Sequence, residues 1–308
     1  MRTLILGGGG MLGSAVLAAA RARGWPSLSL SRAQADVADE ARLDYWMAAF
    51  GPEAVINCAA FTRVDDCEAQ QEHALAVNGE AVGRVARAAE RRGARLLQVS
   101  TDYVFDGGGG RQRPYAEDDA TGPRSAYGRS KLLGEERALA YGRSLVVRTS
   151  WLFGAGGPNF VTAILRQIDG GARQLRVVAD QVGAPTYTPF LARALLDLAP
   201  LQATGIVHYR NCEPVSWYSF AAAIAHWWPG ADGVVEVTPI TTAEMPRPAP
   251  RPAYSVLAVE RCEALLRRPV ESWELGLAEY LSQLSEWSRW RRSHQSHESR
   301  QSRDGRSR

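Results

Sequence analysis

The sequence has 308 residues, of which 45% are hydrophobic and 22% are charged, as in an ordinary globular protein. No apolar run reaches the roughly 20 residues that a membrane-spanning helix needs. The first residues run directly into a glycine loop that belongs to the fold, which argues against a signal peptide. We therefore expect a cytoplasmic protein with no membrane contact, built as one large or two modest domains.

The formal net charge of +3 is unevenly distributed. Residues 287–308 hold seven arginines against Glu298 and Asp304, a contribution of +5, which leaves about −2 on the other 286 residues. A near-neutral body argues against nucleic acid as the main partner. We expect the basic tail 287–308 to be disordered because it lacks apolar periodicity, with anion or nucleic-acid binding as its alternative role.

The cysteines show neither metal-ligand spacing nor a Cys-x-x-Cys pair, so we interpret them as reduced, buried residues: Cys58, Cys67, Cys212 and Cys262.

In the first half, short apolar runs alternate with amphipathic stretches, a pattern typical of a parallel sheet with crossover helices. Strands are predicted at Thr3–Leu6, Ser27–Leu30, Ala54–Asn57, Arg95–Val99 and Leu145–Arg148. Helices are predicted at Met11–Arg23, Asp39–Phe50 and Ala126–Ala140, with one long helix through Ala74, Val77, Ala81, Val82 and Val85 that ends at Gly93. The fold class is therefore α/β, a doubly wound Rossmann-type sheet that binds ligands at the carboxyl ends of its strands.

Beyond residue 150 the alternation weakens. Proline, threonine and glycine interrupt it at Gly183–Thr188, and Pro246–Pro252 is too rich in proline for regular structure. Late helices are predicted at Ser216–Trp227 and Leu275–Trp287. We expect a dinucleotide-binding domain over residues 1–150 and a smaller mixed α/β substrate-binding lobe over 151–286, some of whose segments return to the first domain.

The loop after the first strand has the spacing G-x-x-G-x-x-G at Gly7, Gly10 and Gly13. Glycines there allow a tight turn and a close approach of the backbone to a pyrophosphate, and the following helix offers free N–H groups to its charge. A plain glycine turn is the alternative. The position between the first strand and the first helix favours cofactor binding.

The end of the second strand bears on the choice of cofactor. A site for NAD usually places an acid there, whereas this chain has Arg32 and no acid before Asp36. Arg32 can pair with a 2′-phosphate, unless it is simply a solvated surface arginine. We expect NADPH, with NADH also possible.

Tyr127 and Lys131 lie four residues apart and so share one face of a predicted helix. An ammonium group nearby is expected to lower the pKa of a tyrosine, which makes the phenol a more useful proton donor and acceptor. The preceding strand ends in Ser100 and Thr101, whose hydroxyls can bond to an oxygen that gains negative charge. We interpret Tyr127, Lys131 and Thr101 as catalytic rather than as a surface pair.

The combined motifs resemble the dTDP-4-dehydrorhamnose reductases, within the extended short-chain dehydrogenase/reductases. The resemblance covers about residues 1–285. It rests on GGGGMLG (7–13), the run from Asn57 to Asp65, STDYVFDG (100–107), YGRSK (127–131), the run from Arg148 to Trp151 and DQVGAPT (180–186). STDYVFDG and DQVGAPT are specific to the family, whereas the glycine and Tyr–Lys motifs indicate only the superfamily.

The glycine loop, Arg32 and the resemblance together imply two sets of binding residues. Those for the cofactor are Gly7, Gly10, Met11, Leu12, Gly13, Arg32, Asp36, Val37, Ala59, Ala60, Phe61, Thr62, Val99, Tyr127 and Lys131. Those for the sugar nucleotide are Thr101, Asp102, Trp151 and Asn159, beside the loop Gln181–Thr186. Read without the resemblance, Trp151 can be a core residue, Asp180 can cap a turn, and Asp65 with Asp66 can be N-terminal charges of a helix.

The resemblance also implies the reaction, an NADPH-dependent reduction of the C4 ketone of dTDP-4-dehydro-6-deoxy-L-mannose to dTDP-L-rhamnose for cell-surface polysaccharide. Three alternatives stay open: a ketoreductase of another deoxysugar pathway, a nucleotide-sugar epimerase, and a non-catalytic NADP-binding regulatory subunit. Some members of the family are dimers held by magnesium through glutamates. The first helix has Ser14-Ala15-Val16 instead, so we expect no metal and a monomer or homodimer.

Overall fold

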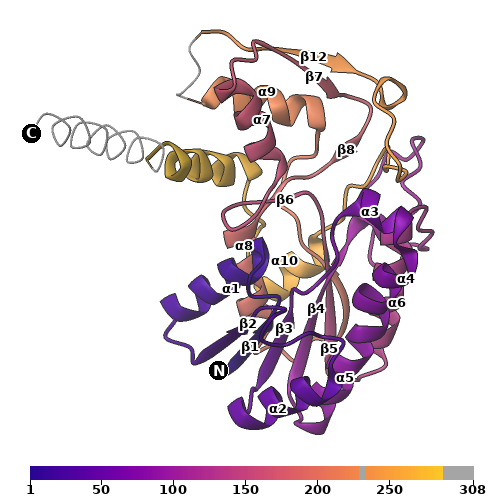
Figure 1. The fold of residues 1–308 in the computed structure, drawn as a ribbon, viewed down its shortest axis with the longest axis vertical. Coiled ribbons are helices and arrows are strands. Elements are labelled where there is room, and N and C mark those ends of the chain that lie inside the picture. Colours follow the sequence, from indigo (N-terminus) through magenta and orange to yellow (C-terminus); the bar gives the residue numbers. More distant parts are fainter. Residues whose placement is uncertain (229–232, 287–308) are drawn as a thin grey trace, which may run out of the picture.

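The computed structural model describes residues 1–228 and 233–286 (Figure 1). Its centre is a six-stranded parallel sheet in the order β10-β5-β4-β3-β1-β2. The strands are β1 (Thr3–Leu6), β2 (Ser27–Leu30), β3 (Ala54–Asn57), β4 (Arg95–Thr101), β5 (Ser144–Thr149) and β10 (Gly205–His208). Between β2 and β3 the chain crosses to the other side of β1, the kind of switch point at which such sheets bind ligands. The predicted doubly wound fold is confirmed.

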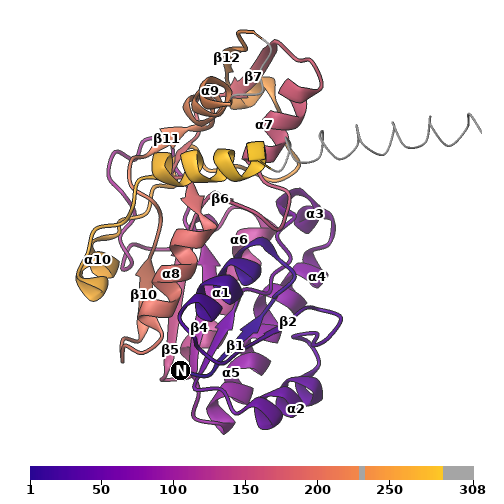
Figure 2. The ribbon, with the colours of Figure 1, turned by 90° about the vertical axis from the view of Figure 1, so that its left-hand side faces the viewer.

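Helices cover both faces of the sheet (Figures 1 and 2). One face packs against α1 (Met11–Ala22) and α8 (Thr188–Leu198), and the other against α2 (Glu40–Phe50) and α5 (Ala81–Arg91). Side chains of β1 alternate between them: Ile5 belongs to the first core, and Leu4 and Leu6 to the second.

Local signals explain why several predicted elements have the observed bounds. The carboxylate of Asp39 accepts a hydrogen bond from the Arg42 N–H and so caps the start of α2, and Gly51 ends this helix in the left-handed conformation (φ 58°). Ser125 caps the helix α6 (Ala126–Leu139) through the Gly128 N–H.

The predicted long helix before β4 is divided in the structure. It consists of α3 (Val64–Ala69), α4 (Gln71–Ala74), a π-helical turn η1 (Leu75–Glu80) and α5. The wider turn brings Asn78 within hydrogen-bonding distance of Phe61 and Ser130. The apolar periodicity is correct, but it does not register this change of helical pitch.

A smaller lobe, seen at the top of Figure 1, follows β5. It contains α7 (Phe160–Asp169), α9 (Trp217–Trp227) and the parallel pair β7 (Gln174–Val178) and β12 (Glu236–Ile240). This part of the chain also has two pairs of two-residue strands. In one, β6 (Leu152–Phe153) pairs with β9 (Thr186–Tyr187); in the other, β8 (Val182–Gly183) pairs with β11 (Val215–Ser216). Short helical turns η2 (Asp102–Val104) and η3 (Thr242–Glu244), the helix α10 (Glu260–Leu266) and a helix over residues 273–286 complete the described chain.

The second half differs in detail from the sequence-based expectation. Helix α9 is present as predicted, and the segment 246–252 has no regular structure. The predicted end of the last helix at Trp287 and the tail 287–308 lie outside the described residues. The domain boundary at residue 150 stays a prediction. Both α8 and β10 come from beyond it: β10 is a strand of the main sheet, and α8 packs on a face of that sheet.

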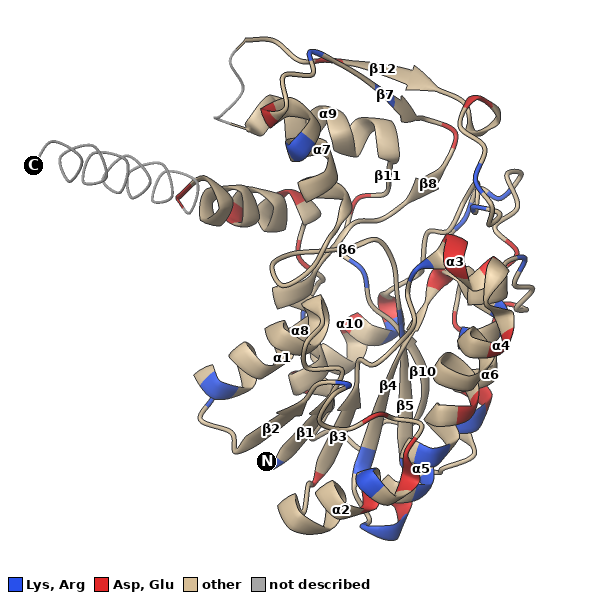
Figure 3. Cartoon of the chain, in the orientation of Figure 1, with Lys and Arg blue, Asp and Glu red and all other residues tan. Residues whose placement is uncertain are grey.

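Charged residues of both signs are frequent in α2, α5 and α6 (Figure 3). Arg87 pairs with Glu40, Arg91 with Asp44, and Arg137 with Glu80. In the described part of the chain, no helix combines the length and the apolar character needed to cross a membrane.

Candidate active site

The glycine loop lies at the carboxyl edge of the sheet, where α1 begins. A side-chain Cβ at Gly7 would lie 2.6 Å from the Ala59 nitrogen, and one at Gly13 would lie 2.3 Å from the Gly7 carbonyl oxygen. Any other residue at these two positions would push the backbones apart. Gly10 is the N-cap of α1 and provides no side-chain cap, so the first N–H groups of this helix remain available to an anion.

A cavity of about 530 Å³ opens in front of this loop. Eight of the predicted cofactor residues line it: Gly7, Gly10, Arg32, Asp36, Val37, Ala59, Ala60 and Phe61. Five further residues complete its wall: Gly9, Ala35, Cys58, His73 and Val77. The volume is in the range of small-molecule sites, and the mixture of glycine backbone, apolar walls and one arginine fits a dinucleotide.

Arg32 is exposed at this cavity and makes no ion pair with any other residue in the described ranges. Its guanidinium is therefore available to a phosphate. Asp36 uses one carboxylate oxygen to accept the Ala38 N–H, which holds the turn after β2. This arrangement supports the predicted preference for a 2′-phosphate.

Several other predicted cofactor residues do not line this cavity. Leu12 and Val99 are buried in the core, and Thr62 is exposed. The Met11 sulfur lies 3.8 Å from the Asn159 side-chain nitrogen, at the junction with the smaller lobe. The roles predicted for these residues stay predictions.

The last three residues of β4 contact three successive turns of α6. Thr101 lies beside the Tyr127 phenol, the Val99 carbonyl accepts a 2.7 Å hydrogen bond from the Lys131 ammonium, and the Ser100 hydroxyl donates to the Glu135 carboxylate. The three helix residues are spaced by four and therefore form one stripe. The structure thus brings the predicted catalytic residues together and adds Glu135 to them.

The pKa of Tyr127 differs in direction from the expectation. Burial raises it, the hydrogen bond with Thr101 lowers it, and Asp102 and Tyr103 raise it further. Lys131 does not offset this effect because its ammonium group is turned toward the Val99 carbonyl. At neutral pH Tyr127 is therefore a protonated phenol.

Lys131 is only 4% exposed. Burial lowers its pKa to about 8, while the negative charge of Glu135 acts in the opposite direction. At neutral pH the ammonium form of Lys131 therefore predominates, but only by a small margin.

Asp102 is buried beside the catalytic pair and accepts a 3.0 Å hydrogen bond from the Thr101 hydroxyl. Burial raises its pKa to about 6, and hydrogen bonds with Ser255 and Thr101 limit the rise.

Trp151 follows β5 in a left-handed backbone conformation (φ 46°) and is half-buried. Its ring stacks on Trp217 at 3.5 Å with an angle of 6° between the planes. Gly183 has no side chain below the Trp151 ring, where a Cβ would lie 2.5 Å away. The two indoles stack between the end of β5 and the start of α9, and the substrate contact predicted for Trp151 stays a prediction.

Asn159 and the DQVGAPT segment hold the smaller lobe in place. Asn159 caps α7, and its side-chain nitrogen donates to the Gly154 carbonyl at 2.9 Å. Asp180 accepts hydrogen bonds from the backbone and hydroxyl of Thr242, as a turn cap does. The substrate contact predicted for Asn159 stays a prediction.

The sequence analysis did not predict two interactions at this site, the hydrogen bonds between Asn78 and Phe61 and the ion pair between Arg148 and Glu135. The side-chain amide of Asn78 bonds to the backbone N–H and carbonyl of Phe61, and so fixes the wall of the cofactor cavity. Arg148 pairs with Glu135 beneath Lys131. The only available signal was the continuation of the Tyr127–Lys131 spacing by four more residues to Glu135.

The segment 246–252 passes over α3. Asp65 accepts the Ala249 N–H and pairs with Arg251 at 2.9 Å, so Asp65 connects the two lobes as well as lying in the first turn of a helix.

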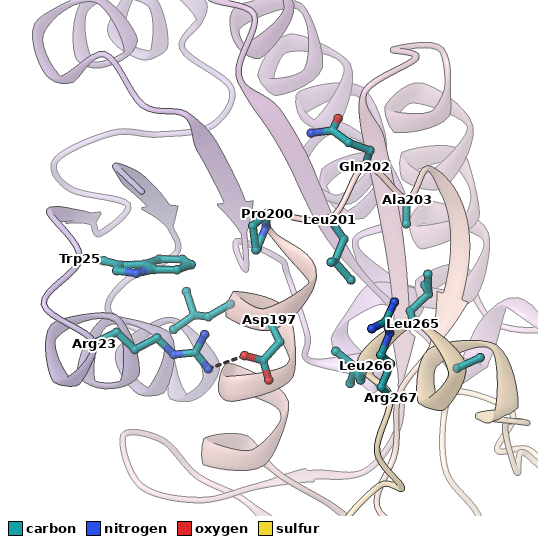
Figure 4. Close-up of a pocket in the computed structure, with 12 residues that line it drawn as sticks. Arg23, Trp25, Asp197, Pro200, Leu201, Gln202, Ala203, Leu265, Leu266 and Arg267 are labelled. Atoms are coloured by element: carbon teal, nitrogen blue, oxygen red, sulfur yellow. Dashed lines mark ion pairs between the residues drawn. The ribbon is translucent and has the colours of Figure 1, made fainter.

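Figure 4 shows a second cavity, of about 890 Å³, between the ends of α1, α8 and α10. Arg23 and Asp197 form an ion pair of 2.8 Å in its wall. Because α1 begins at the glycine loop and ends here, this cavity lies at the opposite edge of the sheet. No predicted site residue lines this second cavity, whereas eight of them line the cavity at the glycine loop.

Within residues 1–228 and 233–286, no group of three or more histidine, cysteine or acidic side chains is arranged to hold a metal ion. The four cysteines are free thiols.

Comparison with known proteins shows the family of the chain. The family model described as the RmlD substrate binding domain matches residues 1–286. A dTDP-4-dehydrorhamnose reductase of Mycobacterium tuberculosis is 42% identical over 286 residues, which cover 91% of this chain and 92% of the relative. The chain belongs to the dTDP-4-dehydrorhamnose reductase family.

Two solved structures resemble this reductase-family chain over its full fold. A dTDP-4-dehydrorhamnose reductase of Clostridium acetobutylicum has 37% identity and a TM-score of 0.87, covering 92% of this chain and 100% of the other. That of Bacillus anthracis, in complex with NADP, has 31% identity and a TM-score of 0.86, covering 92% and 99%.

Proposed function

We propose that this protein reduces the C4 ketone of dTDP-4-dehydro-6-deoxy-L-mannose to a hydroxyl, forming dTDP-L-rhamnose, with NADPH as the cofactor. Membership of the reductase family supports this reaction. The observation that carries it is the meeting of Thr101, Tyr127 and Lys131 at the carboxyl edge of the sheet, beside the dinucleotide-sized cavity.

The glycine loop and the start of α1 would hold the pyrophosphate of NADPH, and Arg32 would hold its 2′-phosphate. When bound, NADPH supplies the hydride that reduces the ketone carbon. Lys131 and the wall from Ala59 to Phe61 would hold the half of the cofactor nearest the substrate.

Tyr127 donates its phenolic proton to the ketone oxygen as that oxygen gains negative charge, which completes the hydroxyl group of the product. Burial raises the pKa of Tyr127, so the phenol keeps its proton until the oxygen becomes basic enough to take it. The Thr101 hydroxyl, which donates to Asp102 in this structure, would turn to offer a second donor to the same oxygen. Asp102 and the Trp151 ring would contact the sugar nucleotide.

We further infer that the enzyme acts in the cytoplasm, as a monomer or homodimer. Its partner is a small dTDP-linked keto-sugar rather than nucleic acid, since the net charge of the chain without its tail is near zero.

The deciding experiment measures NADPH oxidation with a panel of dTDP-4-keto-sugars, followed by product stereochemistry. The Tyr127→Phe variant should lose at least about 100-fold in kcat because it has no proton to donate, yet bind NADPH nearly as well as the wild type. Tyr45→Phe, which changes an exposed tyrosine on α2, is the control and should be fully active. Undiminished turnover by Tyr127→Phe would remove this residue from the mechanism, and a different preferred sugar would correct the substrate.

A further inference from the structure

Beneath the catalytic pair lies a cluster of buried charges. Lys131 is 4% exposed, and the side chains of Glu135 and Arg148 are each 2% exposed. Charged groups are almost never buried to this extent unless they are paired, because desolvation is costly.

The carboxylate of Glu135 is held from two sides. Arg148 on β5 donates to it through Nε at 2.9 Å and through Nη2 at 2.7 Å, a bidentate contact. The Ser100 hydroxyl on β4 donates to the same carboxylate. Glu135 is therefore a fixed negative charge one helical turn beyond Lys131.

The other groups around Lys131 offer little compensation for its charge. Its ammonium group donates a 2.7 Å hydrogen bond to the Val99 carbonyl, which is uncharged. Cys58, after β3, is a neutral thiol because burial raises its pKa to about 12. Tyr127, one turn earlier on α6, is protonated, and Arg148 is itself cationic and bonded to Glu135. Among these neighbours, Glu135 is the group that carries a negative charge.

We propose that Glu135 is a positioning residue that keeps Lys131 in its ammonium form and fixes it against β4, with Ser100 and Arg148 holding the carboxylate in place. The link to turnover rests on the proposed reductase function, but the effect on Lys131 does not.

The sequence makes a direct test available because Lys131 is the only lysine among the 308 residues. Protein produced with ¹³Cε-labelled lysine gives a single side-chain resonance, and its shift across pH reports the protonation of Lys131 alone. Burial lowers the pKa of Lys131 to about 8 even with Glu135 in place. In Glu135→Gln we expect the midpoint to fall by about one pH unit or more. An unchanged midpoint would overturn the proposal.

The neighbouring residue provides a matched control. Glu136→Gln makes the same chemical change on the exposed side of α6 and should leave the midpoint unchanged. Glu135→Asp keeps the negative charge, so its midpoint should lie close to that of the wild type. If Glu135→Gln does not fold because Arg148 is left unpaired, Glu135→Gln/Arg148→Met removes both buried charges, and its midpoint should also lie below that of the wild type. A wild-type midpoint in that double variant would equally contradict the role of Glu135.

Activity gives a second readout. The basic limb of the kcat/KM profile should move to lower pH in Glu135→Gln by the same amount as the resonance. If the titration midpoint of the Lys131 resonance falls but the basic limb of the kcat/KM profile stays at the same pH, the charge of Lys131 does not govern turnover. Absence of activity in the wild type would count against the proposed function and leave the resonance test intact.

Discussion

Asp102 is a buried carboxyl group beside Thr101, and it makes stability depend on pH. Its pKa is raised to about 6 in the folded chain from an ordinary value of 3.8. The folded state therefore binds the proton more tightly than the unfolded state. The resulting stabilisation is fully present below about pH 4 and is lost as the pH rises through 6, on the order of 3 kcal/mol at most.

We therefore expect Asp102→Asn, which resembles the protonated form, to gain stability relative to the wild type between pH 4 and pH 7.5. Urea unfolding at several pH values measures this difference. Asp106→Asn is the control, and we expect it to lose stability over this pH range rather than gain it. The reason is that the hydrogen bond from Tyr115 lowers the pKa of Asp106. Parallel pH curves for Asp102→Asn and the wild type would contradict a raised pKa at this residue.

Arg32 offers a test of cofactor choice at a single exposed side chain. Arg32→Asp removes the partner of the 2′-phosphate and places a carboxylate near it, so the preference of kcat/KM for NADPH over NADH should fall by about 10- to 100-fold. Arg42→Asp makes the same charge change on α2, where the arginine side chain donates to the Gln34 carbonyl, and should keep the preference. Equal ratios in both variants would exclude Arg32 from recognition of the phosphate.

At the scale of elements, the π-helical turn η1 depends on a close contact with α6. A Cβ at Gly134 would lie 2.1 Å from the Asn78 carbonyl oxygen, which is backbone and cannot rotate away. Gly134→Ala should therefore destabilise the fold by about 1–3 kcal/mol through overpacking. Because Asn78 bonds to Phe61, NADPH affinity should fall as well.

Gly142→Ala is the matched control, since a Cβ there meets nothing within 4 Å. Its unfolding midpoint should equal or slightly exceed that of the wild type. A Gly134→Ala variant as stable as Gly142→Ala would mean that the two helices can separate without loss.

The elements differ in how far the sequence alone predicts them. The predicted bounds of β1, β2 and β3 match the observed bounds residue for residue. Each of these strands is a short run next to glycine, proline or a helix cap, and β1 and β3 are buried. The turn η1 was missed because the hydrogen bonds that accompany it, from Asn78 to Phe61 and Ser130, join positions 17 and 52 residues apart. Glu135 was missed for a similar reason: in the sequence it resembles any surface charge on a helix.

At the scale of the whole molecule, the stack of Trp151 on Trp217 joins the sheet to the smaller lobe. Trp217→Ala should remove the support of the Trp151 ring and raise KM for the sugar nucleotide by about 10-fold, while the Kd of NADPH changes little. Trp227→Ala, at the other end of α9 and 36% exposed, is the control. A shift confined to NADPH affinity would place the stack outside the substrate site.

The smaller lobe was predicted as a mixed region, but its strands were not. Four of them have only two residues, which is too short for a periodic pattern. The glycine loop, the Tyr127–Lys131 pair and Thr101 were accessible because their spacing lies within single elements. The contacts of Asp65 and Trp217 were not, since they join segments more than 60 residues apart.

The position of β10 has a consequence for how the chain is made. This strand pairs with β5 although about 60 residues separate them, and it supplies the outer edge of the sheet. On the ribosome, β5 emerges first and presents unpaired N–H and C=O groups until β10 follows. A nascent chain halted within the smaller lobe would therefore carry an open edge, prone to pairing with other chains, and slow synthesis between residues 150 and 205 favours aggregation over folding.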